Sequence, residues 1–269
     1  MLRNCANGRF GVYSFFEVPM NRRSNMKKQY AAILAVLVLA AAALWFYPYG
    51  PQIPSLLVSS IPAECSQIIL VLSPRAESEQ ARLWLMERKY GRWIAVLGHI
   101  PATIGHKGLA WGAGEHSASM PAGFRVKYEG DRCSPAGVFR IPFAFGIAPA
   151  SGADWLKIPY TPLTPSIIGV DDPKSSHYNE VVDSTTVERD WDSNESMIRH
   201  DRLYEWGAFI GHNPQRVPGV GSCIFLHLWP APGKGTAGCT AMSAEDLRTV
   251  LAWLDTAKHP CIVQGLEGW

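Results

Sequence analysis

Short stretches of alternating or continuous apolar residues mark the start of the folded part of the chain. The apolar run at residues 66–73 predicts a buried strand. Residues 82–88 and 92–98 alternate between apolar and polar positions on either side of Tyr90 and Gly91, a pair typical of a tight hairpin turn. Strands this short, joined by hairpins, predict mixed or antiparallel β structure.

The middle of the chain is less regular. Turn-forming residues are dense at 129–137 and apolar stretches flank them, which predicts a strand, a turn and a second strand. Residues 147–206 are polar and show little periodicity, but Trp191, Tyr204 and Trp206 need apolar surroundings. We therefore expect an ordered excursion over the sheet in place of a linker.

The C-terminal part predicts two strands at 208–213 and 222–229, then a helix, then a closing strand from Cys261. Ser243 followed by Asp246 is typical of a helix start. The helix carries one apolar stripe, made of Leu247, Val250, Leu251 and Leu254. The predicted fold class is mainly β with short helices (α+β).

Composition and charge limit the classes of function. The chain has 269 residues, 47% of them hydrophobic and ten of them Trp, which is enough for a sizeable core. Residues 1–28 carry six basic side chains and one acidic one, which leaves 19 basic and 22 acidic side chains in the remainder. A mildly acidic body gives no electrostatic attraction to nucleic acid, so we expect no nucleic-acid partner.

An export segment is predicted at residues 26–47, where two lysines precede an apolar run. It reads equally as a cleaved signal peptide or as a membrane anchor through residues 31–47. Residues 1–25 are then a cytoplasmic tail or precede the true start. Residues 48–64 contain four prolines and read as a linker, and residues 65–266 form the folded domain. We expect this domain outside the cytoplasm, in the periplasm or on the outer membrane face.

Cysteine usage fits this location. Of six cysteines, Cys5 precedes the export segment and the other five lie in the exported body. An odd number of cysteines in an oxidising compartment leaves a candidate reactive thiol, while the remaining four can pair in three ways.

Cys239 is the strongest candidate for that thiol. Alternation in residues 223–228 puts Cys223, Phe225 and His227 on one face of a strand. The loop 230–238 is long enough to return Cys239 to the side of His227, where an imidazole can take the thiol proton. Gly238 leaves room for close backbone approach, and free N–H groups in this turn could stabilise an oxyanion.

The order of these residues resembles the L,D-transpeptidase catalytic domain family, also called the YkuD family. Its usual signature is a His, a spacer, and Ser/Thr-His-Gly-Cys followed by a hydrophobic residue and Asn. This chain has His227 and then Thr236-Ala237-Gly238-Cys239-Thr240-Ala241, so Ala237 and Ala241 depart from the signature. The chain looks like a divergent branch with TAGC as its typical form, and the resemblance covers roughly residues 65–265.

The resemblance implies a mixed β-sandwich or barrel without a cofactor or metal. It also implies a peptidoglycan L,D-transpeptidase: Cys239 forms an acyl-enzyme on a stem peptide with release of D-Ala, and His227 activates it. A neighbouring stem amine then gives a 3→3 cross-link in the cell envelope. Thr236, Gly238 and Thr240 are expected to support the loop or the oxyanion. An L,D-carboxypeptidase or amide hydrolase on the same stems, and a non-catalytic wall-binding module, stay as alternatives.

Other candidates are less specific. Asn213, Tyr178, Asn179 and Asp172 could line the substrate groove, although an Asp-rich turn is more often only a turn. Cys239, His227 and His212 are of the residue types that bind zinc, but the sequence has no closely spaced pair of ligands that would mark a zinc site.

Overall fold

A computed structural model describes residues 28–36 and 50–269. Residues 28–36 are helical and exposed to solvent. The predicted signal or anchor at 26–47 otherwise lies outside the described residues. Among the residues that the structure does describe, no helix is both long enough and apolar enough to cross a membrane.

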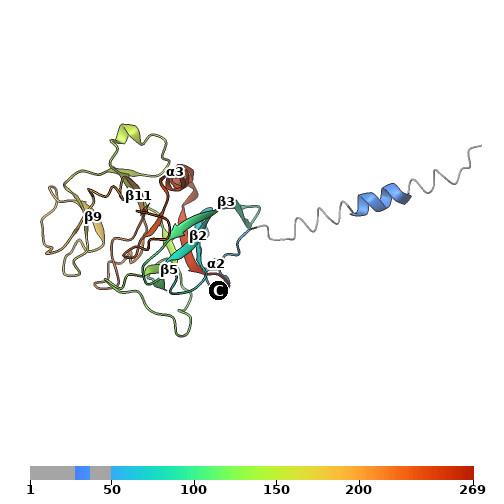
Figure 1. The fold of residues 1–269 in the computed structure, drawn as a ribbon, viewed down its shortest axis with the longest axis horizontal. Helices are drawn as coiled ribbons and strands as arrows, with labels where there is room; N and C mark the ends of the chain where they lie inside the picture. The colour runs from blue at the N-terminus through green and yellow to red at the C-terminus, as the bar shows by residue number, and fades with distance from the viewer. Residues whose placement is uncertain (1–27, 37–49) are drawn as a thin grey trace, which may run out of the picture. The chain divides into compact units, whose positions relative to one another are not determined.

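Strands make up most of the regular secondary structure of the folded domain (Figure 1). The main sheet has eleven strands, in the spatial order β4 (Leu109–Trp111), β5 (Ser134–Arg140), β14 (Cys261–Leu266), β1 (Gln67–Ser73), β2 (Gln80–Lys89), β3 (Arg92–Thr103), β13 (Thr240–Met242), β12 (Phe225–Leu228), β11 (Trp206–Phe209), β6 (Ala144–Gly146) and β7 (Tyr160–Pro162). The helices are short: α2 (Ser55–Val58), α3 (Ala244–Trp253) and the 3-10 turns η1 (Ala150–Gly152) and η2 (Thr256–Lys258).

Pairing in this sheet is mixed. Strands β1 and β14, β12 and β13, β4 and β5, and β6 and β7 pair in parallel, and the other neighbours pair antiparallel. The prediction of a mainly β domain with short helices and mixed pairing is confirmed. The finer expectation of a sandwich or barrel stays a prediction.

The hairpin between β2 and β3 is confirmed. Its two turn residues, Tyr90 and Gly91, have φ values of 53° and 73°. A positive φ at both positions is the geometry of the type I′ turn, whose twist matches that of the strands it joins.

The strand predicted before residue 129 is wrong. Only one isolated bridge, between Trp111 and Val126, forms there, and β5 begins within the segment read as a turn. The reason is a buried ion pair: Lys127 Nζ lies 2.6 Å from Asp131 Oδ1, and both side chains are inaccessible. Lys127 thus points inward as an ion-pair partner, while the apolar Val126 is exposed.

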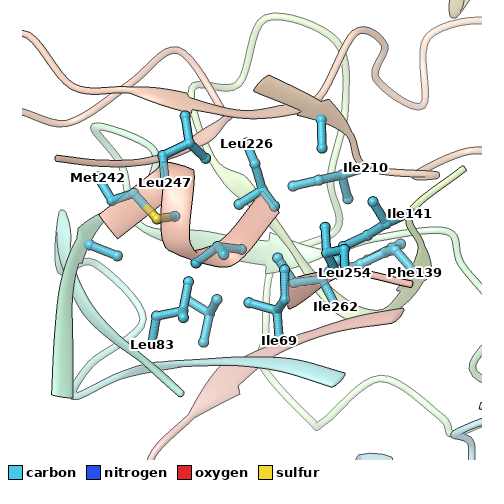
Figure 2. Close-up of a cluster of buried hydrophobic side chains, with 14 of the residues drawn as sticks. Ile69, Leu83, Phe139, Ile141, Ile210, Leu226, Met242, Leu247, Leu254 and Ile262 are labelled. Carbon is cyan, nitrogen blue, oxygen red and sulfur yellow. The ribbon is translucent and has the colours of Figure 1, made fainter. Parts of the chain in front are cut away.

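Helix α3 forms as predicted. The Ser243 side chain accepts a hydrogen bond from the Asp246 N–H at 3.1 Å, which caps the helix start. The four residues of its predicted stripe are all fully buried. Figure 2 shows Leu247 of the helix and Leu254, its C-terminal cap, among the sheet residues of the core, which include Ile69, Leu83, Leu226, Met242 and Ile262.

The two faces of β12 and β13 bury different clusters. Leu226 and Met242 belong to the core that contains α3. Phe225 and Cys239 belong to a second cluster, which is not built on α3. Because successive side chains of a strand point to opposite faces, His227 lies on the same face as Phe225 and Cys239.

The excursion at 147–206 supplies most of the cover on that second face. It contains a separate three-stranded sheet, in the order β10 (Glu195–Ser196), β8 (Ile167–Val170) and β9 (Glu180–Asp183). In Figure 1 this sheet lies near the label β9, on the opposite side of the ribbon from β2 and β3. Leu163, Met197 and Tyr204 of the excursion pack in the cluster of Cys239, so the expectation of an ordered excursion is confirmed.

Truncation of α3 tests its role in the main core. We expect Leu251→Ala to lower the free energy of unfolding by about 2–5 kcal/mol, because it opens a cavity at a fully buried position. Urea unfolding of the purified protein measures this change. The exposed neighbour Thr249→Ala is the control, and a similar loss in both variants would contradict the packing described here.

Candidate active site

Cys239 and His227 share one buried face of the sheet. In the parallel register of β12 and β13, Leu226 pairs with Thr240 and His227 pairs with Ala241. Cys239, just before β13, is therefore one step along the same face from the partner of His227. The two side chains are 7% and 5% exposed, respectively.

The hydrogen bond of His227 fixes its tautomer. Nδ1 lies 2.7 Å from the carbonyl oxygen of Leu228, which can only accept, so Nδ1 carries the proton and Nε2 keeps its lone pair. The Tyr204 ring packs edge-on against the imidazole, with centroids 5.3 Å apart. Burial lowers the pKa of His227 to about 4, so the ring is neutral at pH 7.

The Cys239 thiol lies among backbone groups. Its Sγ accepts a hydrogen bond from the Phe225 N–H at 3.3 Å and donates toward the Cys223 carbonyl at 3.8 Å. Burial raises the pKa of Cys239 to about 12, with a smaller contribution from the carboxylate of Glu195. Thiol and imidazole are thus both neutral in this closed site, which avoids the cost of burying a charge pair.

Thr236 and Gly238 shape the loop that leads to Cys239. Thr236 Oγ1 donates to the Cys239 carbonyl at 2.6 Å and accepts from the Gly238 N–H at 3.1 Å. A Cβ on Gly238 would lie 3.1 Å from the Cys133 carbonyl oxygen, so the close approach is real. These contacts favour a role in supporting the loop over a role in binding an oxyanion, because the Gly238 N–H already donates to Thr236 Oγ1. Ala237, at the signature histidine position, is exposed.

Ser134 completes this loop and was not singled out by sequence reasoning. Its Oγ accepts from the Gly105 N–H at 2.9 Å and contacts the carbonyls of Gly238 and Cys239 at 2.7 and 2.9 Å. The only available signal was its place within the turn-rich segment 129–137. A hydroxyl that holds two carbonyls from a distant strand leaves no local pattern in the sequence.

Thr240 lies on the other face from the thiol. Its Oγ1 donates to Gln264 Oε1 at 2.6 Å, and Gln264 Nε2 donates to the Pro135 carbonyl at 2.9 Å. This buried chain of hydrogen bonds ties β13 to β14 and β5. The structure therefore places Thr240 where it can support the strand, on the opposite face from the Cys239 thiol.

Tyr178 and Asn179 bind the backbone that leads into β12. Tyr178 Oη donates to Glu129 Oε2 at 2.5 Å and accepts from the Gly221 N–H at 3.1 Å. Asn179 Oδ1 accepts from the Cys223 N–H at 2.9 Å. Asn179 thereby holds the residue whose carbonyl meets the Cys239 thiol.

Asn213 and Asp172 are also buried and bonded to backbone. Asn213 Nδ2 donates to the Gly221 carbonyl at 3.1 Å. Asp172 accepts from the N–H groups of Lys174 and Asp192 at 3.0 and 2.7 Å, and the two bonds lower the pKa of its carboxyl. The groove role of these residues, and of Tyr178 and Asn179, stays a prediction, because their polar atoms hold turns in this structure.

His212 uses both ring nitrogens on backbone. Nδ1 accepts from the Ala113 N–H at 3.3 Å, and Nε2 donates to the Val220 carbonyl at 3.1 Å. Burial lowers the pKa of His212 to about 4. Within residues 28–36 and 50–269, no group of three or more His, Cys, Asp and Glu side chains is arranged to hold a metal ion.

A polar network from the excursion surrounds Tyr204, whose ring packs against His227. Tyr204 Oη donates to Glu195 Oε1 at 2.5 Å, and Arg199 NH1 lies 3.3 Å from the same oxygen. The Arg199 guanidinium lies over the Tyr204 ring, 5.1 Å from its centroid. Burial raises the pKa of Glu195, and the Tyr204 hydroxyl opposes this shift. The sequence marked Tyr204 only as an aromatic residue that needs packing.

Acid should weaken the fold through its buried imidazoles. His227 and His212 have pKa values lowered from 6.5 to about 4, so the unfolded chain takes up protons first as the pH falls. Their stabilisation is present above pH 6.5 and is lost as the pH falls through 4, on the order of 3 kcal/mol for each ring. Urea unfolding between pH 7 and 4 measures this loss.

His227→Gln should remove one ring's share of the pH slope. The exposed His200→Gln serves as control and should keep the slope of the wild-type protein. A slope unchanged by His227→Gln would mean that this imidazole is not held neutral by burial.

Comparison with known families agrees with this geometry. The family model described as the L,D-transpeptidase catalytic domain matches residues 77–263, which include every strand from β3 to β13 as well as His227 and Cys239. A search of curated proteins gives no match to the chain. Since the family model covers well over half of the sequence, the chain belongs to the YkuD family of L,D-transpeptidase catalytic domains.

Proposed function

We propose that this protein is a peptidoglycan L,D-transpeptidase that forms 3→3 cross-links through an acyl-enzyme on Cys239. The acyl donor is a stem tetrapeptide, which loses its terminal D-Ala. The acyl acceptor is the side-chain amine of a neighbouring stem. Membership of the YkuD family supports the reaction class. The donor, the acceptor and the roles of the residues are part of our proposal.

One observation carries the proposal. The parallel register of β12 and β13 puts a thiol and an imidazole on the same buried face, and the hydrogen bond from His227 Nδ1 to the Leu228 carbonyl leaves the lone pair on Nε2. A neutral imidazole with one nitrogen held by a carbonyl and the other free is suited to act as a general base.

The reaction takes two balanced steps. Cys239 Sγ attacks the carbonyl carbon that precedes D-Ala while His227 Nε2 takes the thiol proton. The C–N bond then breaks, and the imidazolium gives this proton to the leaving amine. In the second step the acceptor amine attacks the thioester and loses a proton to Nε2, which returns it to the departing thiolate. Water in place of the amine would give a tripeptide.

The closed site has to open for this chemistry. Cys239 is 7% exposed, and the excursion residues Leu163, Met197 and Tyr204 pack around it. A stem peptide reaches the thiol only if these side chains move. Their displacement also admits water and polar substrate groups, which lowers the thiol pKa toward its ordinary value, because burial is the main cause of the shift.

The proposed place of action is the cell envelope. Two lysines followed by an apolar run in residues 26–47 support export of the body. Retention through residues 31–47 or cleavage after export are both compatible with a domain that begins beyond a proline-rich linker.

Product analysis tests the reaction. The purified protein, incubated with disaccharide-tetrapeptide, is expected to yield a cross-linked dimer with loss of D-Ala, detected by mass spectrometry. Cys239→Ala is expected to abolish the product, and His227→Gln to lower its rate by about 100-fold or more, because the thiol loses its base. Cys133→Ala is a matched thiol control, since the Cys133 thiol contacts the Lys107 carbonyl and not the catalytic pair.

The other outcomes are informative. A tripeptide without a dimer would mean that water resolves the acyl-enzyme and that the protein is an L,D-carboxypeptidase. Dimer formation by Cys239→Ala would remove the thiol from the mechanism. Loss of activity in Cys133→Ala as well would show that the assay reports folding and not the nucleophile.

Removal of the cover should expose the nucleophile. We expect Tyr204→Ala to speed alkylation of Cys239 by iodoacetamide by about tenfold or more, because loss of its contacts with Phe145, Phe225 and His227 favours the open state. Tyr204→Phe keeps the ring and is expected to react nearly as slowly as wild type. Equal rates in all three proteins would mean that the thiol is reached by another route.

A further inference from the structure

Two further cysteines, Cys65 and Cys261, lie in a different buried cluster from Cys239. Cys65 lies two residues before β1, and Cys261 is the first residue of β14. These strands are parallel neighbours, and Ile68 pairs with Cys261. Both cysteines are fully buried in one apolar cluster, together with Leu57, Ile68, Leu70, Met86 and Val263.

Backbone contacts hold the two cysteines on facing segments. The Ser66 N–H donates to the Lys258 carbonyl at 2.9 Å, just ahead of the paired strands. The thiol of Cys65 donates to the Gln67 carbonyl at 3.1 Å, and that of Cys261 lies 3.8 Å from the His259 carbonyl. Each thiol thus also contacts a carbonyl of its own segment.

The two thiols also hydrogen bond each other. This bond lowers the pKa of Cys65 and raises the pKa of Cys261, so Cys65 is the one that ionises first. The nearby guanidinium of Arg140 lowers the pKa of both thiols. Two thiols close enough to hydrogen bond, on the segments of two parallel neighbours and in one buried cluster, are placed where a disulfide can form.

We propose that Cys65 and Cys261 form a disulfide when the domain folds outside the cytoplasm, an inference that rests on the proposed export. The oxidant is a protein disulfide of the dithiol oxidoreductase class. The Cys65 thiolate attacks one sulfur of that disulfide and releases one oxidant thiolate. The Cys261 thiolate then attacks the Cys65 sulfur of the mixed disulfide and releases the second. Two protons leave the domain, and two electrons pass to the oxidant.

The contacts of the other three described thiols explain why the pairing is selective. Cys133 contacts the Lys107 carbonyl, and Cys223 the Val170 carbonyl. The Cys239 thiol contacts the backbone oxygen of Cys223 and not its sulfur. Cys65 therefore pairs with Cys261, the thiol that it contacts, and the thiol of Cys239 stays reduced.

Burial dictates when the exchange takes place. Both cysteines are fully inaccessible in the folded domain, so an oxidant protein can reach them only before β14 has docked against β1. After docking, the same burial shields the bond from reductants.

Peptide mapping tests the proposal on the full chain. One sample is purified from a disulfide-forming compartment, and a second is refolded in a mixture of reduced and oxidised glutathione. Free thiols are blocked under denaturing conditions before digestion. We expect the Cys65 and Cys261 peptides to be linked in both samples and lighter by two hydrogen atoms, with Cys133, Cys223 and Cys239 blocked. Free Cys65 and Cys261 in either sample would overturn the proposal.

Variants separate this bond from catalysis. Cys65→Ser and Cys261→Ser are each expected to leave the partner thiol free and to lower the melting temperature of the oxidised protein to that of the reduced one. Cys133→Ser should keep the link. If the link forms but Cys239 gives no cross-linked product, only the proposed function fails; if the product forms without the link, only the disulfide fails.

Discussion

The parallel pairing of β12 with β13 is the constraint on which the site depends. Parallel neighbours need a crossover, and most proteins use a helix for it. Here a loop rich in Pro and Gly makes the crossing. Three hydrogen bonds join its end to residues just before β2 and just after β3: Gly235 N–H to Glu79, Thr236 N–H to Ile104 and His106 N–H to the Thr236 carbonyl. The register that results puts His227 opposite Ala241. Cys239, two residues before Ala241, therefore lies on the same face of the sheet as His227.

Burial keeps both Cys239 and His227 neutral in the closed domain. In papain-like chemistry a thiolate and an imidazolium stabilise each other, but charge is costly where no water is available. In this domain the thiol pKa is raised and the imidazole pKa is lowered, so the closed state holds an unreactive thiol. Reactivity is therefore coupled to access: any movement that exposes the thiol also restores the solvent that favours thiolate.

Local patterns predicted the parts of the fold that local forces decide. Alternation through residues 223–228 predicted both faces of β12, and Ser243 with its apolar stripe predicted α3, because side-chain period and capping act within a few residues. The strand expected before residue 129 failed because the partner of Lys127 is an acid in the following turn, and charge pairing overrode alternation.

Distant contacts escaped prediction for a different reason. Ser134 reaches a loop about a hundred positions away, and Tyr204 covers a histidine from a segment with no periodicity. Asn179 was a groove candidate only because it is polar in an Asp-rich stretch, and its bond to the backbone of the distant Cys223 left no local signal. Only the resemblance in the TAGC segment connected residues 227 and 239 to a reaction, since spacing alone allowed several.

The placement of β14 between β1 and β5 has a consequence for biogenesis. The last strand fills the position next to the first, and the Ser55 N–H bonds the carbonyl of Trp269, which brings the C-terminus beside α2 (Figure 1). A growing chain that lacks residues 261–266 leaves two strand edges open and cannot close its core. The two buried clusters that contain Ile262 and Val263 are therefore completed only when the C-terminal end of the chain has been added.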